Sequence, residues 1–329
     1  MSDNQSSSER SPSGADRPAG WERDVLTKLA ESALGEQRKA RRWGIFFKSL
    51  TFLYLFIVLF VALGWVGSRE AATGGKHTAL VELNGVIEAD SMASADVVNA
   101  GLNDAFENKN TQGVILRVNS PGGSPVQAHQ INREIRRLRG KFPGIPLYVV
   151  VDDICASGGY YVAAAADEIY VSEGSLIGSI GVLMDGFGFT GAMEKLGVER
   201  RLLTAGENKG FLDPFSPLSD KQRAFAVSML GDIHEQFIKI VREGRGQRLK
   251  ENEDMFSGLF WTGDRSIQMG LADAIGDASY VAREVIKAEN IVDFTPRENL
   301  AERFAKRFGA AVGEAIVKVG GGAANVRLR

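Results

Sequence analysis

The stretch LYVVVDDICASGGYYVAAAA, residues 147–166, decides the fold, because it joins an apolar strand to a helix of small residues through a short turn. Ser157 lies at that turn. Backbone N–H groups in the first turn of a helix are unpaired and carry partial positive charge. We therefore expect Ser157 to be a buried nucleophile and the Gly158 N–H to stabilise an oxyanion on the carbonyl that it attacks. The alternative is that Gly158 and Gly159 only permit close packing.

A second glycine-rich turn lies upstream, in GVILRVNSPGGS, residues 113–124, where another apolar strand ends in a tight loop that opens a helix. Gly122 and Gly123 can adopt positive φ angles and allow the backbone to approach a ligand closely. This arrangement suits a second oxyanion donor or a segment that binds a substrate strand. The alternative is a simple helix cap at Ser120 or Ser124.

These two motifs, NSPGG at 119–123 and ASGGYY at 156–161, resemble those of the signal peptide peptidase A family of membrane-bound serine peptidases. The resemblance covers about residues 79–295. It implies the Clp protease/crotonase fold, an α/β superhelix of ββα units. It also implies that Ser157 forms the acyl-enzyme and that the N–H groups of Gly158 and Gly123 hold the oxyanion.

The family uses a serine–lysine dyad, and its Gly-x-x-Lys turn matches GENK at 206–209. The resemblance thus implies Lys209 as the general base. Lowering the pKa of a lysine from about 10.4 toward 7 costs roughly 4–5 kcal/mol, and desolvation is the expected cause. An apolar wall for this purpose could come from Phe211, Leu212 and Phe215. Many relatives carry an acidic residue directly after the lysine, where this chain has Gly210.

The family's Gly-Ser-x-Gly turn matches GSIG at 178–181, which implies that Ser179 orients Lys209. From the residues alone, Ser179 could equally cap a turn. The motif FWTGDRSIQMGLAD at 260–273 is similar to the family's closing helix-turn motif, and we expect it to be structural.

Other chemistries have little support. The three histidines, His77, His129 and His234, show no metal-pair spacing, and we expect His129 to be solvated on a surface helix. We expect Cys155 to pack as a small apolar residue. We expect no cofactor and no metal, and the balance of 39 basic and 41 acidic residues argues against a nucleic-acid partner. A crotonase-type acyl-CoA enzyme would share the fold, but the uncharged apolar run at 49–67, a candidate membrane anchor, and the Gly-x-x-Lys turn argue against it.

Residues 49–67 carry no charge and have about the length that a helix needs to cross a membrane. Basic residues concentrate before this run, at Arg38, Lys39, Arg41, Arg42 and Lys48. Positive charge favours the cytosolic side, so we expect a single-pass inner-membrane protein with a cytosolic N-terminus and an extracytoplasmic catalytic domain.

The chain divides into six predicted regions. These are a disordered cytosolic tail (1–20), a basic amphipathic juxtamembrane segment on the membrane surface or against a partner helix (21–48), the transmembrane helix (49–67), a linker (68–76), the peptidase domain (77–295), and a C-terminal amphipathic helix and tail (296–329). Within the domain, strands are predicted near 79–87, 113–119, 147–152, 168–172, 180–184 and 198–204, and helices near 93–108, 124–140, 157–166 and 217–243.

These features predict a membrane-anchored serine endopeptidase that cleaves apolar peptides such as remnant signal peptides. The substrate would bind as an added strand beside Gly122 and Gly123. The resemblance implies a homo-oligomeric ring, such as an octamer, with each site shared between subunits. The alternatives are a non-catalytic membrane scaffold with a peptidase fold and a quality-control protease for misfolded envelope proteins.

Overall fold

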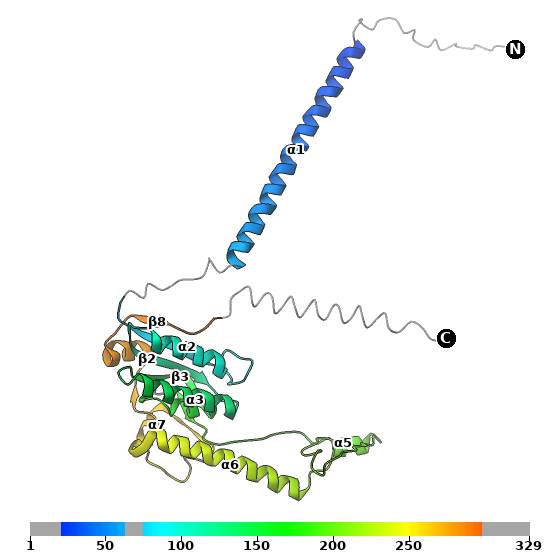
Figure 1. Cartoon of the computed structure of the whole chain (residues 1–329). Helices are drawn as coiled ribbons and strands as arrows, with labels where there is room; N and C mark the ends of the chain where they lie inside the picture. Colours follow the sequence, from blue (N-terminus) through cyan, green and yellow to red (C-terminus); the bar gives the residue numbers. More distant parts are fainter. Residues whose placement is uncertain (1–20, 63–74, 298–329) are drawn as a thin grey trace, which may run out of the picture. The chain divides into compact units, whose positions relative to one another are not determined.

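The computed structural model describes residues 21–62 and 75–297. The helix of the first range and the domain of the second belong to two separate compact units (Figure 1). The predicted tail at 1–20 and almost all of the predicted C-terminal segment at 296–329 lie outside the described residues, as does most of the linker at 68–76.

The first unit contains one continuous helix, α1 (Trp21–Ala62). Within it, Leu34–Phe60 is long and apolar enough to cross a membrane. These 27 residues extend about 40 Å at the helical rise, which exceeds the thickness of a hydrocarbon core. The sequence suggested two segments meeting at residues 48 and 49, but the helix has no break there. The last predicted transmembrane residues, 63–67, are outside the described residues.

The second unit is built on one mixed sheet. Its strands are β1 (His77–Asn84), β2 (Thr111–Ser120), β3 (Leu147–Ala156), β4 (Glu168–Val171), β5 (Leu176–Gly178), β6 (Phe260–Thr262), β7 (Ala274–Ile275) and β8 (Ile291–Asp293). The order along the sheet is β6-β5-β3-β2-β1-β8, and β4 pairs with both β3 and β7. All pairs are parallel except β5 with β6. Parallel pairing requires crossover connections, which the helices supply.

The described helices of this unit are α2 (Ala95–Glu107), α3 (Pro125–Lys141), α4 (Gly158–Ala163), α5 (Thr190–Lys195), α6 (Asp220–Arg245), η1 (Gly246–Arg248), α7 (Gly263–Gln268), α8 (Ala278–Tyr280) and η2 (Val281–Ile286). The longest have side-chain caps that define where they begin. Ser94 caps α2, Ser124 caps α3, and Ser219 forms a capping box with Gln222 at α6.

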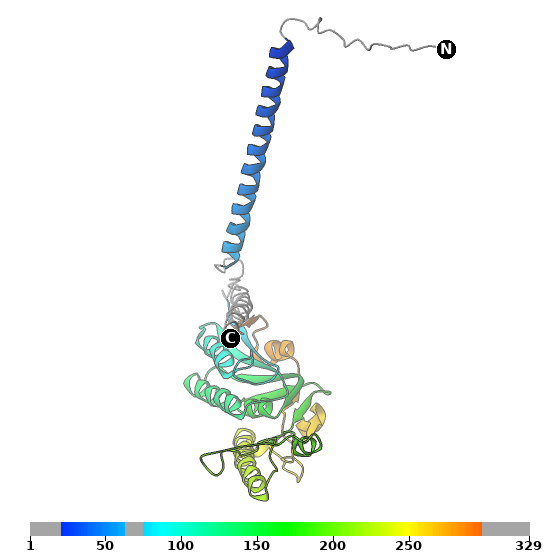
Figure 2. The ribbon, with the colours of Figure 1, turned by 90° about the vertical axis from the view of Figure 1, so that its right-hand side faces the viewer.

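Alternate residues of the central strands face two different cores. In β1, Ala79, Val81 and Leu83 point into the larger cluster, with buried residues of α2 and α3. Leu80 points to the other face, where η2 covers it. This is the two-residue period of a strand buried on both sides. Figure 2 shows the sheet between the two layers, with η2 in orange.

The four helix predictions inside the domain match α2, α3, α4 and α6 to within a few residues. The predictions of strands at 180–184 and 198–204 are wrong. Both ranges belong to or adjoin a segment without strands, residues 183–219, which we call the arm. Val198 and Leu203 are exposed, and no neighbouring strand in the described range pairs with them. A strand persists only where its backbone groups find partners.

Candidate functional site

A cavity of about 570 Å³ lies where β3 and β5 end. Four of the residues predicted for the site line it, namely Ser157, Gly158, Gly123 and Ser179. Its other walls come from α3, α4 and α6 and include Ala128, His129, Tyr161, Ile233, Gln236 and Phe237. The structure therefore brings together in space four residues that come from three separate turns of the chain.

Ser157 is the N-cap residue of α4 and has φ 51° and ψ −121°. A non-glycine residue with positive φ costs about 1–3 kcal/mol and persists only where its surroundings hold it. The Ser157 N–H donates to the Gly178 carbonyl at 2.8 Å, and the Ser157 carbonyl accepts from the Tyr161 N–H at 3.0 Å. Within the described chain the Ser157 hydroxyl is free of hydrogen bonds, on a half-buried residue facing the cavity. That state suits a nucleophile.

The Gly158 and Gly123 backbones lie close together beside Ser157. A Cβ on Gly158 would lie 3.2 Å from the Gly123 nitrogen. Among the described turns, loops and caps, no acceptor takes a hydrogen bond from either N–H group. Two free N–H groups lining one cavity next to a serine can stabilise a tetrahedral oxyanion. Their role as donors remains a prediction.

Gly122 lies close to Ser157, with a backbone φ of +100°. A Cβ at this position would lie 2.7 Å from the Cβ of Ser157 and 2.6 Å from the nitrogen of Gly158. Only glycine fits without moving the serine. Ser120 shapes this turn by accepting from the Gly122 N–H at 3.1 Å, whereas Ser124 is the residue that caps α3.

Ser179 follows β5 and also has a positive φ of 50°. Its N–H donates to the Leu259 carbonyl at 2.7 Å. The preceding residue, Gly178, supplies the carbonyl that binds the Ser157 N–H, so the two serine turns are directly connected. The Ser179 hydroxyl has no hydrogen-bond partner in residues 75–297 and faces the same cavity. It is available to orient a base delivered from elsewhere.

Lys209 does not line this cavity. It lies in the arm and is exposed. Of the apolar residues that could have formed a wall around it, Phe211 is half-buried against Phe225, whereas Leu212 and Phe215 are exposed. The single chain therefore positions the predicted nucleophile, Ser157, but leaves the predicted base in solvent.

The turn that carries Lys209 has its own anchors. Glu207 pairs with Lys221 in the first turn of α6 at 2.7 Å. At Gly210, a Cβ would lie 2.8 Å from the Cδ2 of Leu202, so the missing side chain allows Leu202 to pack against the turn. Gly210, which stands where many relatives have an acidic residue, thus leaves room for Leu202.

Two residues of the cavity were not predicted as part of the site. The Tyr161 hydroxyl and His129 Nδ1 form a hydrogen bond of 3.0 Å across the cavity wall. His129 is exposed, as expected, but it is bound to Tyr161 rather than simply solvated. Burial raises the pKa of the Tyr161 hydroxyl. The position of Tyr161, four residues after Ser157 on a short helix, is the sequence signal that could have identified it.

The remaining titratable candidates lie away from the chemistry. Cys155 is fully buried, and burial raises the pKa of its thiol, so it packs as a small apolar side chain. His234 binds the Ile180 carbonyl at 3.2 Å and ties α6 to the segment after Ser179. His77 is buried and contacts the Gly75 carbonyl and Thr111. In the described ranges, no group of three or more His, Cys, Asp or Glu side chains could hold a metal ion.

The chain is similar to known proteins over part of its length. Residues 141–292 match the family model described as "Peptidase family S49". A protein of Enterococcus faecium named "Putative signal peptide peptidase SppA" is 30% identical over 57% of this chain and 54% of its own length. "Protease 4" of Haemophilus influenzae is 31% identical over 65% of this chain and 35% of its own length.

A third similar protein carries a different name. The "Na(+)/H(+) antiporter NhaA" of Brucella melitensis biotype 1 is 46% identical over 178 residues, which are 54% of this chain and 24% of that protein. The match leaves three quarters of that protein uncovered, so its transport activity does not follow for this chain. In all three cases, the chain spans at most about half of the relative's length.

Proposed function

We propose that the chain is a member of peptidase family S49, and that it is a serine endopeptidase anchored to a membrane through α1. The observed sheet and its helices confirm the predicted α/β class, and the match to the family model supports the Clp protease/crotonase type. The observation that carries the proposal is Ser157, held at positive φ beside a cavity, with the free N–H groups of Gly158 and Gly123 next to it.

In the proposed reaction, the Ser157 hydroxyl attacks the scissile carbonyl, and neutral Lys209 takes its proton. The N–H groups of Gly158 and Gly123 bind the resulting oxyanion. Collapse of the tetrahedral intermediate breaks the C–N bond, and the Lys209 ammonium returns the proton to the leaving amine. Water then attacks the acyl-enzyme, with Lys209 again acting as base, and releases Ser157.

Since Lys209 is absent from the cavity of its own chain, we propose that another copy delivers it in a ring-shaped homo-oligomer. The arm supports this assignment because it exposes large apolar side chains. Leu203 is 95% exposed, Leu183 81% and Phe187 80%. Monomeric proteins rarely expose apolar surface on this scale, and burial against a second copy would remove it from water. Ser179 would then orient the incoming amine.

The proposed substrates are apolar peptides, such as remnant signal peptides, bound as an added strand beside Gly122 and Gly123. Ile233 and Phe237 give the cavity apolar walls that suit such side chains. The basic residues before the apolar run support a cytosolic N-terminus and an extracytoplasmic domain. A quality-control protease for misfolded envelope proteins would use the same residues on different substrates.

A non-catalytic scaffold is the second candidate, because a single chain does not bring Lys209 to Ser157. The two candidates differ in one assay. The full chain, purified in detergent, is given a fluorogenic apolar peptide and compared with Ser157→Ala and Lys209→Ala. We expect both variants to be inactive and Lys195→Ala, a control at another exposed lysine of the arm, to keep its activity.

Co-expression of the two inactive variants then tests whether the site is shared. Mixed oligomers would contain some interfaces with an intact Ser157 on one copy and an intact Lys209 on the other, so we expect activity to return in part. Full activity of Lys209→Ala would refute the dyad. An inactive wild-type chain in a proven oligomer would favour the scaffold.

A further inference from the structure

Ser157 keeps its strained conformation only if the short helix that follows it is held at both ends. Helix α4 has only six residues, all buried, and Ser157 is its N-cap. At the front, the Gly178 carbonyl and the Gly122 backbone hold the serine. A strained residue relaxes if the helix behind it can shift, so the far end of α4 also matters for the nucleophile.

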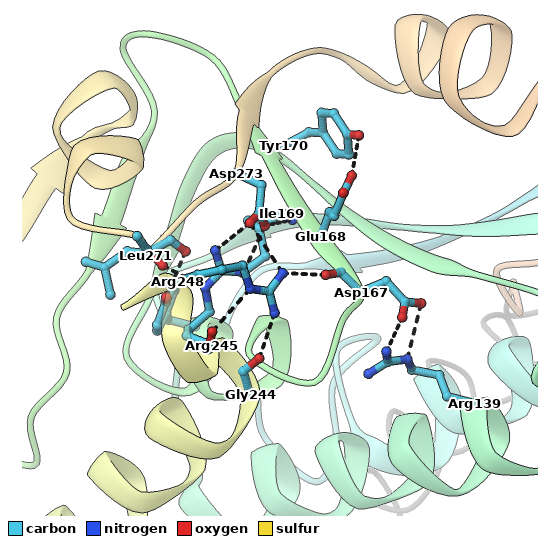
Figure 3. A network of polar contacts seen from close by, with 12 residues as sticks. Arg139, Asp167, Glu168, Ile169, Tyr170, Gly244, Arg245, Arg248, Leu271 and Asp273 are labelled. Atoms are coloured by element: carbon cyan, nitrogen blue, oxygen red, sulfur yellow. Dashed lines mark hydrogen bonds and ion pairs between the residues drawn. The ribbon is translucent and has the colours of Figure 1, made fainter. Parts of the chain in front are cut away.

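Two arginines and one tyrosine fix the far end of this helix. Arg139 Nη1 donates to the Ala165 carbonyl at 2.6 Å, and Arg248 Nη1 donates to the Asp167 carbonyl at 2.6 Å. The hydroxyl of Tyr160, inside α4, donates to the Leu271 carbonyl at 2.8 Å. The chain leaving α4 is therefore bound to α3, to η1 and to the turn before β7, as Figure 3 shows in part.

The turn that receives Tyr160 is itself held by a buried ion pair. The side chain of Arg245, at the end of α6, is 1% exposed and makes two hydrogen bonds of 2.8 Å to the Asp273 carboxylate. Its Nε donates to the Gly270 carbonyl at 2.8 Å, next to Leu271. Asp273 also accepts from the Ile169 N–H at 2.7 Å, which fixes the start of β4 (Figure 3).

A buried ion pair is weak evidence for a gain in stability, because desolvation of both charges opposes their attraction. Although burial acts to raise the pKa of Asp273, hydrogen bonds from Arg245 keep it below its ordinary value, so the pair is charged. The geometry of the ion pair shows that it also fixes the position of the groups around it. Its bidentate form sets both distance and angle between α6 and the turn at 270–273.

Helix α6 also touches α4 directly, through a glycine. A Cβ on Gly244 would lie 1.9 Å from the Ala164 carbonyl oxygen and 2.8 Å from its carbon. Gly244 is the penultimate residue of α6, and the absence of a side chain there permits this close approach. Gly231 in the same helix has nothing within 4 Å of its Cβ position.

We propose that Gly244, Arg245 and Asp273 are positioning residues for the nucleophile. They hold the far end of α4, and through it they keep Ser157 in its strained conformation and the Gly158 N–H directed into the cavity. None of them touches the substrate, and the inference rests on the proposed peptidase function.

The first test compares two alanine substitutions in one helix. Gly244→Ala and Gly231→Ala both replace a glycine of α6, but only the first pushes on the end of α4. In the full-length oligomer, we expect Gly244→Ala to lower kcat by about 10- to 100-fold with KM little changed, as a small displacement of catalytic groups does. Gly231→Ala should match the wild type.

The same variants are titrated with a peptide boronate, which forms a tetrahedral adduct on Ser157, and with a non-cleavable peptide of the same sequence. We expect Gly244→Ala to lose boronate affinity by the factor lost in kcat and to keep its affinity for the ground-state peptide. Equal losses for both ligands, or none, would overturn the proposal.

The second test uses the ion pair. Arg245→Lys keeps the charge but cannot form the bidentate contact. The double variant Arg245→Met/Asp273→Leu replaces both charges with apolar groups of similar size, which buried sites often tolerate. We expect both variants to lose kcat and boronate affinity together, while the double variant keeps its thermal midpoint and oligomeric state.

A double variant with a lower thermal midpoint but normal kcat and boronate affinity would show that the pair is only structural. A wild-type chain that neither cleaves peptide nor binds boronate would overturn the proposed function and this proposal together. Active wild type with fully active variants would overturn the positioning role alone.

Discussion

The segment around Ser157 and the arm around Lys209 carry the two predicted members of one dyad, and they differ in almost every physical respect. Ser157 is held by backbone hydrogen bonds and by close glycine contacts, and it precedes a fully buried helix. Lys209 lies in an exposed turn, and large apolar side chains of the arm are open to solvent. A single chain thus positions Ser157 and the N–H groups proposed as oxyanion donors, whereas the proposed base would need a second copy to reach them.

The largest loss of activity should follow from adding a methyl group to Gly122, in the segment around Ser157. Gly122→Ala would place a Cβ 2.7 Å from that of Ser157, at a φ of +100°. We expect peptidase activity to fall by about 100-fold or more, the scale seen when an oxyanion donor is lost. The matched change in the arm, Gly210→Ala, meets only the flexible tip of Leu202 and should alter activity by less than about 3-fold. Initial rates on a fluorogenic peptide measure the effect of each variant. Similar losses of activity in both variants would show that the two segments do not differ in this way.

A polar group on the arm should act through assembly. Leu203 is 95% exposed, so Leu203→Asp has little to disrupt within a single chain. If another copy buries this residue, we expect activity to fall by about 10-fold or more, together with the loss of oligomers in sedimentation experiments. The unfolding midpoint of the separated chains should stay unchanged. If the variant stays oligomeric and fully active, the surface around Leu203 is not the one through which the arm completes the site.

Acid should loosen the arm through Asp213. Hydrogen bonds from Ser216 and Phe215, together with the Arg200 charge, hold the pKa of this carboxyl below its ordinary value. A group whose pKa is lowered by folding stabilises the folded state above its unfolded pKa of about 3.8, and that contribution is lost as the pH falls through the lower, folded value. We expect protease cleavage within residues 183–219 to increase below about pH 4. Asp213→Asn should remove this pH dependence, and an unchanged dependence would assign it to other groups.

The smallest effect should come from the surface ion pair at the base of the arm. Glu207 and Lys221 are 2.7 Å apart, but both side chains are about three quarters exposed. We expect Lys221→Ala to change the free energy of unfolding by less than about 0.5 kcal/mol in urea titrations. Activity should also stay close to that of the wild type. A large loss of activity would mean that the chain itself positions the Lys209 turn more firmly than its exposure suggests.

Much of the domain could be predicted from the sequence because its signals are local. Apolar runs at 113–119 and 147–152 became β2 and β3, and serine caps followed by periodic apolar residues became α3 and α6. The strand predictions at 180–184 and 198–204 failed because these residues find no partner strand in the described domain. The short strands β6 and β7 escaped prediction because three residues or fewer leave almost no pattern.

The candidate site likewise combines features that the sequence predicts with features that it does not. Glycine-rich turns next to Ser157, Gly122 and Ser179 were visible in the sequence, because only certain residues tolerate positive φ and close backbone approach. The contact of Tyr161 with His129 was not visible, because it joins residues 32 apart along the chain. The pairing of Arg245 with Asp273 joins residues 28 apart, and likewise has no local signature.

The sequence by itself determined the similarity to peptidase family S49, the strand–turn–helix that carries Ser157, and the apolar run that makes α1 long and apolar enough to cross a membrane. Tertiary structure alone decided that three turns meet in one cavity, that the end of α6 presses on α4, and that Lys209 lies outside the cavity. The physical reason is the distance along the chain over which each effect acts. Backbone propensity and apolar period act between near neighbours in the chain, whereas catalytic geometry depends on packing between segments that only the folded sheet brings together.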